Sequence, residues 1–134
     1  MPADVFFDTN VLIYSIAQND PRSMQAETLL AAGGRVGVQQ LNEMASVTRR
    51  KMGMPWPEIR EALGAILTLC PTPVAITLAT HQSALEIEER YGYGIYDALV
   101  LAAALQSKCR IIYSEDFQDG QLIEGKVTVR NPFS

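Results

Sequence analysis

The sequence predicts an α/β domain built as a three-layer α/β/α sandwich, with a central, mainly parallel sheet of about five strands. Short apolar runs that look like strands recur along the chain, and segments with helical character separate them. Strands that alternate with helices form parallel sheets covered by helices on both faces. With 134 residues, 48% of them hydrophobic, the chain can form one core, so we expect a single domain over residues 1–134.

Five short apolar runs are the predicted strands. Runs of this length without polar alternation are typical of strands buried on both faces. The order of the strands in the sheet does not follow from this pattern. The runs cover residues 5–7, 35–38, 74–76, 110–113 and 126–129.

Six helices are predicted from apolar spacing and from start and stop signals. The first directly follows the first strand, the second begins at a proline and stops at two glycines, and the third ends in a basic turn. The fourth opens on a proline, the fifth repeats its apolar spacing, and the sixth is apolar on nearly all sides, which predicts full burial. They cover residues 9–17, 21–32, 39–52, 57–69, 78–91 and 97–106.

Charge and cysteine content exclude several classes of protein. The chain has 11 Lys and Arg against 15 Asp and Glu, and this net charge of −4 argues against a broad basic surface. Its two cysteines show no metal-ligand spacing, so we expect reduced, buried thiols. The chain start lacks the cationic segment of a signal peptide, and no apolar stretch is long enough to span a membrane. The sequence therefore predicts a cytoplasmic protein without membrane contact.

Four acidic residues are predicted to gather at one edge of the sheet. Asp8 ends the first strand and Asp116 follows the fourth, while Glu43 and Asp97 lie near the starts of two helices. The carboxyl ends of the strands and the amino ends of the helices share the edge at which α/β sheets bind ligands. Oxygen donors without a Cys/His cluster favour Mg²⁺ or Mn²⁺ over zinc. A metal held there could activate a water for hydrolysis of a phosphodiester.

Each acid also has an ordinary structural explanation. Asp8 and Asp97 could cap helices by accepting backbone N–H bonds. Glu43 could belong to a solvated helix face, and Asp116 could belong to an acidic turn with Glu115 and Asp119. The convergence of all four acids on one edge favours the metal site over four separate explanations.

These motifs resemble those of the PIN-domain ribonucleases, and in particular the VapC toxins of bacterial toxin–antitoxin pairs. The resemblance implies a PIN fold in which Asp8, Glu43, Asp97 and Asp116 surround one or two Mg²⁺ or Mn²⁺ ions, and a metal-activated water cleaves RNA. It spans essentially the whole chain and rests on V-F-F-D-T-N-V-L at residues 5–12, Asn42-Glu43, Tyr96-Asp97-Ala98-Leu99 and Ser114-Glu115-Asp116-Phe117.

The resemblance also implies supporting residues and partners. Thr9 and Asn10 belong to the first motif, and Ser114 takes the place of a Ser or Thr that helps to hold the acids. Where relatives often show Thr-x-Asp-x-Asp-Phe, this chain reads S-E-D-F-Q-D from Ser114 to Asp119, so either Glu115 or Asp119 could assist Asp116. The implied partners are an RNA substrate, a cognate antitoxin and a second copy of the chain in a homodimer.

Three further residues could contact RNA. Arg49 and Arg50 lie in the only basic run, where they either complement the dipole of a helix end or hold phosphates. Tyr93 lies in a glycine-containing loop, where it either packs against the sheet or stacks on an unpaired base.

Two other functions fit parts of the sequence. A receiver-like signalling module also has an acidic, Mg²⁺-binding edge, but it needs a phosphoacceptor Asp at the end of a middle strand. Neither residues 35–38 nor residues 74–76 are followed by one. A catalytically silent PIN domain kept for protein contacts is the other alternative, and the intact set of four acids argues against it.

Overall fold

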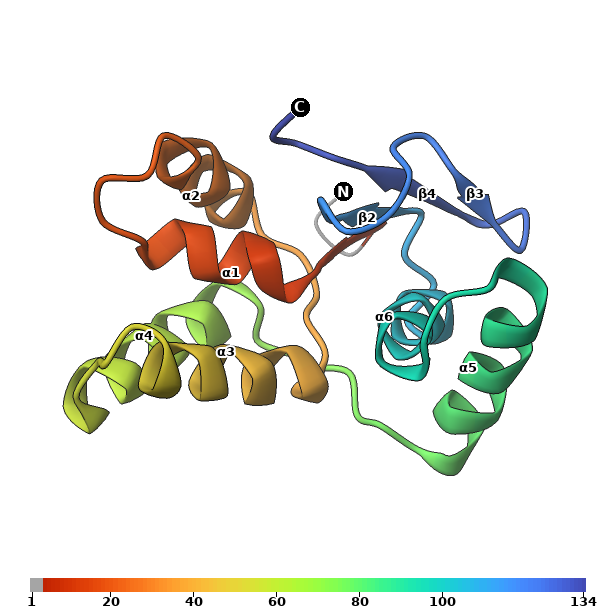
Figure 1. Cartoon of the computed structure of the whole chain (residues 1–134), viewed down its shortest axis with the longest axis horizontal. Coiled ribbons are helices and arrows are strands. Elements are labelled where there is room, and N and C mark those ends of the chain that lie inside the picture. Colours follow the sequence, from red (N-terminus) through yellow and green to blue (C-terminus); the bar gives the residue numbers. More distant parts are fainter. Residues whose placement is uncertain (1–3) are drawn as a thin grey trace.

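A computed structural model describes residues 4–134 of the chain (Figure 1). Strands β1, β2 and β4 run parallel, and the short β3 pairs antiparallel with β4, so the expected mainly parallel sheet is confirmed. In this part of the chain the strand order is β1-β2-β4-β3. The strands are β1 (Val5–Phe7), β2 (Ile111–Tyr113), β3 (Leu122–Ile123) and β4 (Val127–Arg130).

The six helices of residues 4–134 form the outer layers. Side chains alternate across each strand, so Phe6 joins a hydrophobic cluster with α5 and α6, whereas Phe7 joins a cluster with α1, α2 and α3. Figure 1 shows α5 and α6 on the side of the sheet away from α1 and α2. The expected sandwich is therefore confirmed. The helices are α1 (Thr9–Ile16), α2 (Ser23–Ala31), α3 (Val38–Arg50), α4 (Trp56–Leu69), α5 (Leu78–Tyr91) and α6 (Ile95–Gln106).

Two of the five predicted strands are wrong as strands. Residues 35–38 form two isolated parallel bridges, one between Arg35 and Phe6 and one between Gly37 and Val74, and the second is the bridge of residues 74–76. The first run stops early because α3 begins directly after Gly37, whose backbone N–H donates to Gln40 Oε1 at 3.1 Å. The expected five strands are therefore replaced by four strands and two bridges.

A glycine allows the first of these bridges to form. A Cβ atom at Gly34 would lie 2.6 Å from the ring of Phe7 and 3.0 Å from the backbone oxygen of Val5. Without it, the chain comes close enough for the Arg35 backbone N–H to donate to the Val5 oxygen at 2.8 Å. This contact adds the segment after α2 to the edge of the sheet at β1.

Other expectations are met or shifted by a few residues. Helix α6 begins at Ile95, two residues before the predicted start, and the two-residue β3 was not predicted. Cys70 and Cys109 are buried thiols, as expected, and burial raises the pKa of the Cys70 thiol to about 11. Over residues 4–134, no helix combines the length and the apolar character that crossing a membrane requires.

Candidate metal centre

Asp8 lies at the junction of β1 and α1, with 4% of its surface exposed. Its backbone N–H donates to the Tyr113 oxygen on β2 at 3.0 Å, which fixes the junction against the neighbouring strand. Its Oδ1 accepts the Thr9 N–H at 2.7 Å and so caps α1, while its Oδ2 accepts the Ser114 hydroxyl at 2.7 Å. The capping explanation therefore holds for Asp8, and each carboxylate oxygen still has room for a second partner.

Ser114 and Asn10 connect Asp8 to Asp116. The Ser114 hydroxyl donates to Asp8 and accepts from the Asp116 N–H at 3.1 Å and from Asn10 Nδ2 at 3.2 Å, which uses its full bonding capacity. Asn10 Nδ2 also donates to Asp116 Oδ2 at 3.2 Å, and Asn10 Oδ1 accepts the Glu115 N–H at 3.4 Å. The ends of β1 and β2 are thus held together by one polar network.

Glu43 and Asp97 approach this network from two helices. Glu43 lies in the second turn of α3, and its Oε1 is buried without a hydrogen-bond partner. Asp97 is the third residue of α6, whose N-cap is Gly94, so the capping explanation for Asp97 is wrong. Both carboxylates thus keep acceptor oxygens that the described protein leaves open.

The four carboxylates form one electrostatic group, which we call the acidic edge: Asp8, Glu43, Asp97 and Asp116. Burial raises the pKa of Asp8 to about 7, and the nearby Asp116 and Glu43 add to the rise against the two hydrogen bonds that Asp8 accepts. Burial also raises the pKa of Glu43 and Asp97, and Asp116 raises both further. Asp116 therefore lies within electrostatic reach of each of the other three.

The chemistry of the acidic edge fits a divalent cation. Among residues 4–134, no Lys, Arg or His side chain forms an ion pair with any of its carboxylates. In the same residues, no three His, Cys, Asp or Glu side chains stand in a ready metal-ligating arrangement. Mg²⁺ keeps several of its waters and takes few protein ligands, so it does not need such a cage. The open Glu43 Oε1 and the uncompensated Asp8 carboxylate are the oxygen donors that Mg²⁺ or Mn²⁺ prefers.

The comparison with known proteins decides the family. Residues 5–118 match the family model of the PIN domain. The chain belongs to the PIN domain family. No curated protein sequence gives a significant match.

Two solved structures share the fold of this PIN domain. A toxin–antitoxin complex from Klebsiella pneumoniae aligns with a TM-score of 0.72 at 18% identity, over 96% of this chain and 98% of that one. The Mycobacterium tuberculosis toxin VapC20, which cleaves the sarcin–ricin loop, aligns with a TM-score of 0.62 at 19% identity, over 84% of this chain and 91% of that one. At these identities the likeness concerns the fold.

A second charged group borders the acidic edge in this PIN domain, and the sequence did not reveal it. Tyr14 donates a hydrogen bond to Glu115 Oε1, and Arg22 donates to the Tyr14 hydroxyl at 2.7 Å. Arg22 also forms two side-chain bonds to Asp20, at 2.8 and 2.9 Å, and lies 3.7 Å from Glu115 Oε2. We call Tyr14, Asp20, Arg22 and Glu115 the Arg22 clamp. Helical spacing in the sequence could have indicated the position of Tyr14, since Tyr14 follows Asn10 by four residues and shares its face of α1.

The Arg22 clamp bears on the two residues expected to assist Asp116. Glu115 is held by Tyr14 and Arg22, so its carboxylate is neutralised within the protein. Asp119 Oδ1 accepts the Asn131 N–H at 2.8 Å, which ties it to the chain after β4. Each of these two carboxylates therefore has a partner outside the acidic edge. Thr9 is buried beside Asp8, and its hydroxyl has no hydrogen-bond partner.

Two of the three residues expected to touch RNA have other contacts in the structure. Arg49 donates to the Met54 oxygen at 3.2 Å and lies 5.0 Å above the Trp56 ring, so it supports the turn between α3 and α4. Arg50 is exposed in the last turn of α3. Tyr93 donates to Gln121 and packs edge-on against Phe117, with ring centroids 5.1 Å apart.

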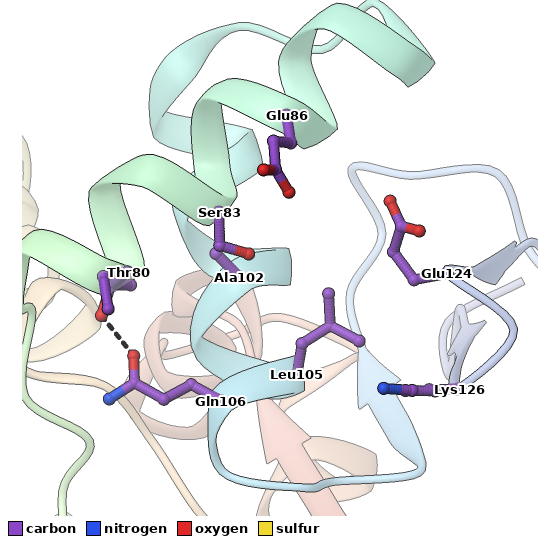
Figure 2. A pocket seen from close by; sticks show the side chains of 9 residues that line it. Thr80, Ser83, Glu86, Ala102, Leu105, Gln106, Glu124 and Lys126 are labelled. Atoms are coloured by element: carbon purple, nitrogen blue, oxygen red, sulfur yellow. Dashed lines mark hydrogen bonds between the residues drawn. The ribbon is translucent and has the colours of Figure 1, made fainter.

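A separate hollow of about 400 Å³ lies between α5, α6 and the β3–β4 turn (Figure 2). In Figure 2, Thr80 bonds to Gln106 at one end, and Glu86 and Glu124 flank the other, with Lys126 below Glu124. Glu124 is already paired with Arg90. No member of the acidic edge lines this hollow, so it is not part of the candidate metal centre.

Proposed function

We propose that this PIN domain is a metal-dependent endoribonuclease and the toxin of a toxin–antitoxin pair. The observation that carries the proposal is the acidic edge. Burial and neighbouring carboxylates raise the pKa of Asp8, Glu43 and Asp97, and no cation from residues 4–134 forms an ion pair with any of the four acids. The structural neighbours support the biological role, since one is a toxin–antitoxin complex and the other is an RNA-cleaving toxin.

Each member of the acidic edge has a proposed role as a ligand to one or two Mg²⁺ or Mn²⁺ ions. When bound, the metal would supply an acidified water for attack on phosphorus and would neutralise charge on the phosphoryl oxygens. Ser114 and Asn10 orient Asp8 and Asp116 through the hydrogen bonds described above. Glu43 and Asp97, whose oxygens remain open, complete the set from the two helices.

We further propose a cognate antitoxin and a homodimer as partners of the chain. The Klebsiella structure supports the antitoxin, because that protein of similar fold was solved in complex with one. Copurification of the chain with the product of an adjacent small gene would test the antitoxin, and light scattering of the purified chain would test the homodimer.

The test of the function is RNA cleavage by the purified full chain. We expect cleavage of total bacterial RNA with Mg²⁺ or Mn²⁺ and none in EDTA, with a loss of more than about 100-fold in Asp97→Asn. Glu58→Gln is a matched control, because Glu58 is also an acid at the third position of a helix but lies outside the acidic edge. Folded parent protein that cleaves no RNA with either metal would leave a silent PIN interaction domain as the better account.

A further inference from the structure

A positively charged groove crosses the face of the sheet that α5 and α6 do not cover. It encloses about 400 Å³ over β2 and β4, and Arg110, Lys126, Thr128 and Arg130 line it together with Ile111 and Asp4. The groove does not include any member of the acidic edge. It is therefore a second feature of the surface, independent of the candidate metal centre.

The alternation of β4 creates this face. Val127 and Val129 are buried toward α5 and α6, so Thr128 and Arg130 point to the opposite side. The helices of that side pack around Phe7 on β1, which is the edge strand on the far side of β2 from β4. Figure 1 shows α5 and α6 below β4 and no helix above it. Parallel sheets are usually covered on both faces, so an open face over β4 leaves room for a ligand.

Positive charge exceeds negative charge in the lining of the groove. Arg110, Lys126 and Arg130 are exposed, and none forms an ion pair or a side-chain hydrogen bond with another residue of 4–134. Asp4 is the single acid of the lining, so three cations face one anion there. This local surplus stands out in a chain whose net charge is −4.

The groove leads to the acidic edge. Lys126 precedes β4 and Arg110 precedes β2, so both lie at the amino ends of the strands. Arg130 lies at the carboxyl end, where it pairs with Tyr113, and its backbone oxygen accepts the Ser114 N–H at 3.1 Å. Four residues of extended chain span ~13 Å. The line of cations therefore ends beside the loop that carries Ser114 and Asp116.

We propose that this groove binds the phosphate backbone of the RNA strand that continues away from the cleaved bond, an inference that rests on the proposed function. Arg and Lys side chains contact phosphate oxygens, and the Thr128 hydroxyl can donate to one. The lining contains no aromatic side chain for base stacking, so it holds the strand without reading its sequence. The cations also offset the repulsion between RNA and the acidic edge.

The test compares Arg130→Gln and Lys126→Gln with Arg60→Gln, a matched control that removes one exposed cation from α4. The probe is a short fluorescein-labelled oligouridylate, titrated in EDTA at several salt concentrations. We expect each groove variant to raise Kd by about three- to tenfold and to lower the salt slope by about 0.7, with the control unchanged. In Mn²⁺, the groove variants should raise KM for cleavage and leave kcat close to that of the parent.

The outcomes separate this proposal from the proposed function. A parent that cleaves RNA, with groove variants equal to it in Kd, salt slope and KM, would overturn the groove and leave the nuclease standing. A parent that binds RNA through the groove without cleaving it would overturn the nuclease and leave the groove as an RNA site. Binding of a polyglutamate peptide that depends on Arg130, with no such dependence for RNA, would assign the groove to an acidic protein segment and overturn the proposal.

Discussion

Two neighbouring groups of acids at the carboxyl ends of the strands differ in whether the protein supplies a cation to pair with them. In the Arg22 clamp, Glu115 and Asp20 share Arg22, and a tyrosine hydroxyl completes the contact. One residue further along, Asp116 belongs to the acidic edge, which forms no ion pair within residues 4–134. The difference shows which acids the fold neutralises itself and which it leaves for a cation from outside.

The largest expected effect is a gain of stability in Asp8→Asn at alkaline pH. The pKa of Asp8 is raised from 3.8 to about 7, so the folded chain binds this proton more tightly than the unfolded chain does. Without metal, the free energy of unfolding of the parent should therefore fall as pH rises from about 4 to about 7. Asparagine carries no charge and keeps one acceptor oxygen for the Thr9 N–H, but its amide nitrogen cannot accept from the Ser114 hydroxyl. The variant should therefore be more stable at pH 8 by less than the ~4 kcal/mol that the pKa shift alone would give. Urea unfolding in EDTA at pH 4 and pH 8 measures this, and equal stabilities at pH 8 would contradict it.

Addition of metal should restore the stability that the charged acidic edge loses at alkaline pH. A ligand that binds only the folded chain at about 100 times its Kd stabilises it by about 2.7 kcal/mol. We expect Mn²⁺ to raise the melting temperature of the parent at pH 8, and to raise that of Asp8→Asn far less. Samples treated with EDTA provide the melting temperatures without metal. An equal Mn²⁺-induced rise in the melting temperature of parent and variant would mean that Asp8 does not hold the metal.

Removal of the Ser114 hydroxyl should lower both the stability of the fold and the rate of RNA cleavage. In Ser114→Ala, the Asp8 carboxylate loses a donor, and Asn10 and the Asp116 N–H lose an acceptor. We expect a loss of about 1–3 kcal/mol in the free energy of unfolding and of about 10- to 100-fold in RNA cleavage. Ser114→Thr keeps the hydroxyl and should restore most activity. An alanine variant that cleaves like the parent would show that the network does not position the acids.

The smallest effect is expected in the Arg22 clamp. Arg22 is partly exposed, so Arg22→Gln should lower the free energy of unfolding by no more than about 1 kcal/mol. The same change leaves Glu115 without its cation next to Asp116, which should enlarge the Mn²⁺-induced rise in melting temperature. Arg60→Gln serves as the control for loss of one charge. An unchanged Mn²⁺ response in Arg22→Gln would mean that Glu115 lies beyond electrostatic reach of the acidic edge.

The fold class and the general places of the four acids could be predicted from the sequence, because both follow from local patterns. Apolar runs and helical spacing mark the layers, and the chain order assigns Asp8 and Asp116 to the ends of parallel strands. The strand number could not be predicted. Residues 35–38 and 74–76 are apolar, but whether such a run pairs over several residues or only once depends on where the next helix begins.

Local sequence patterns could not predict the contacts between side chains that are far apart in the chain. The Arg22 clamp joins α1 and the α1–α2 connection to the loop after β2, which follows them by about a hundred residues. The groove likewise depends on a strand order that the pattern does not contain, since β2 and β4 become neighbours only in the sheet. A sequence shows which residues carry charge, whereas their pairing is decided by the packing of the whole chain.

The double duty of Asp8 constrains how this chain can change by mutation. The same side chain caps α1 and joins the acidic edge, so selection for a folded protein and selection for a working site act on one codon. A related chain that no longer needed a working site would still need a short hydrogen-bond acceptor at position 8 to cap α1, which favours Asn or Ser over Ala. Among decayed copies of such a chain, position 8 would therefore retain a capping residue long after Asp97 had drifted to unrelated types.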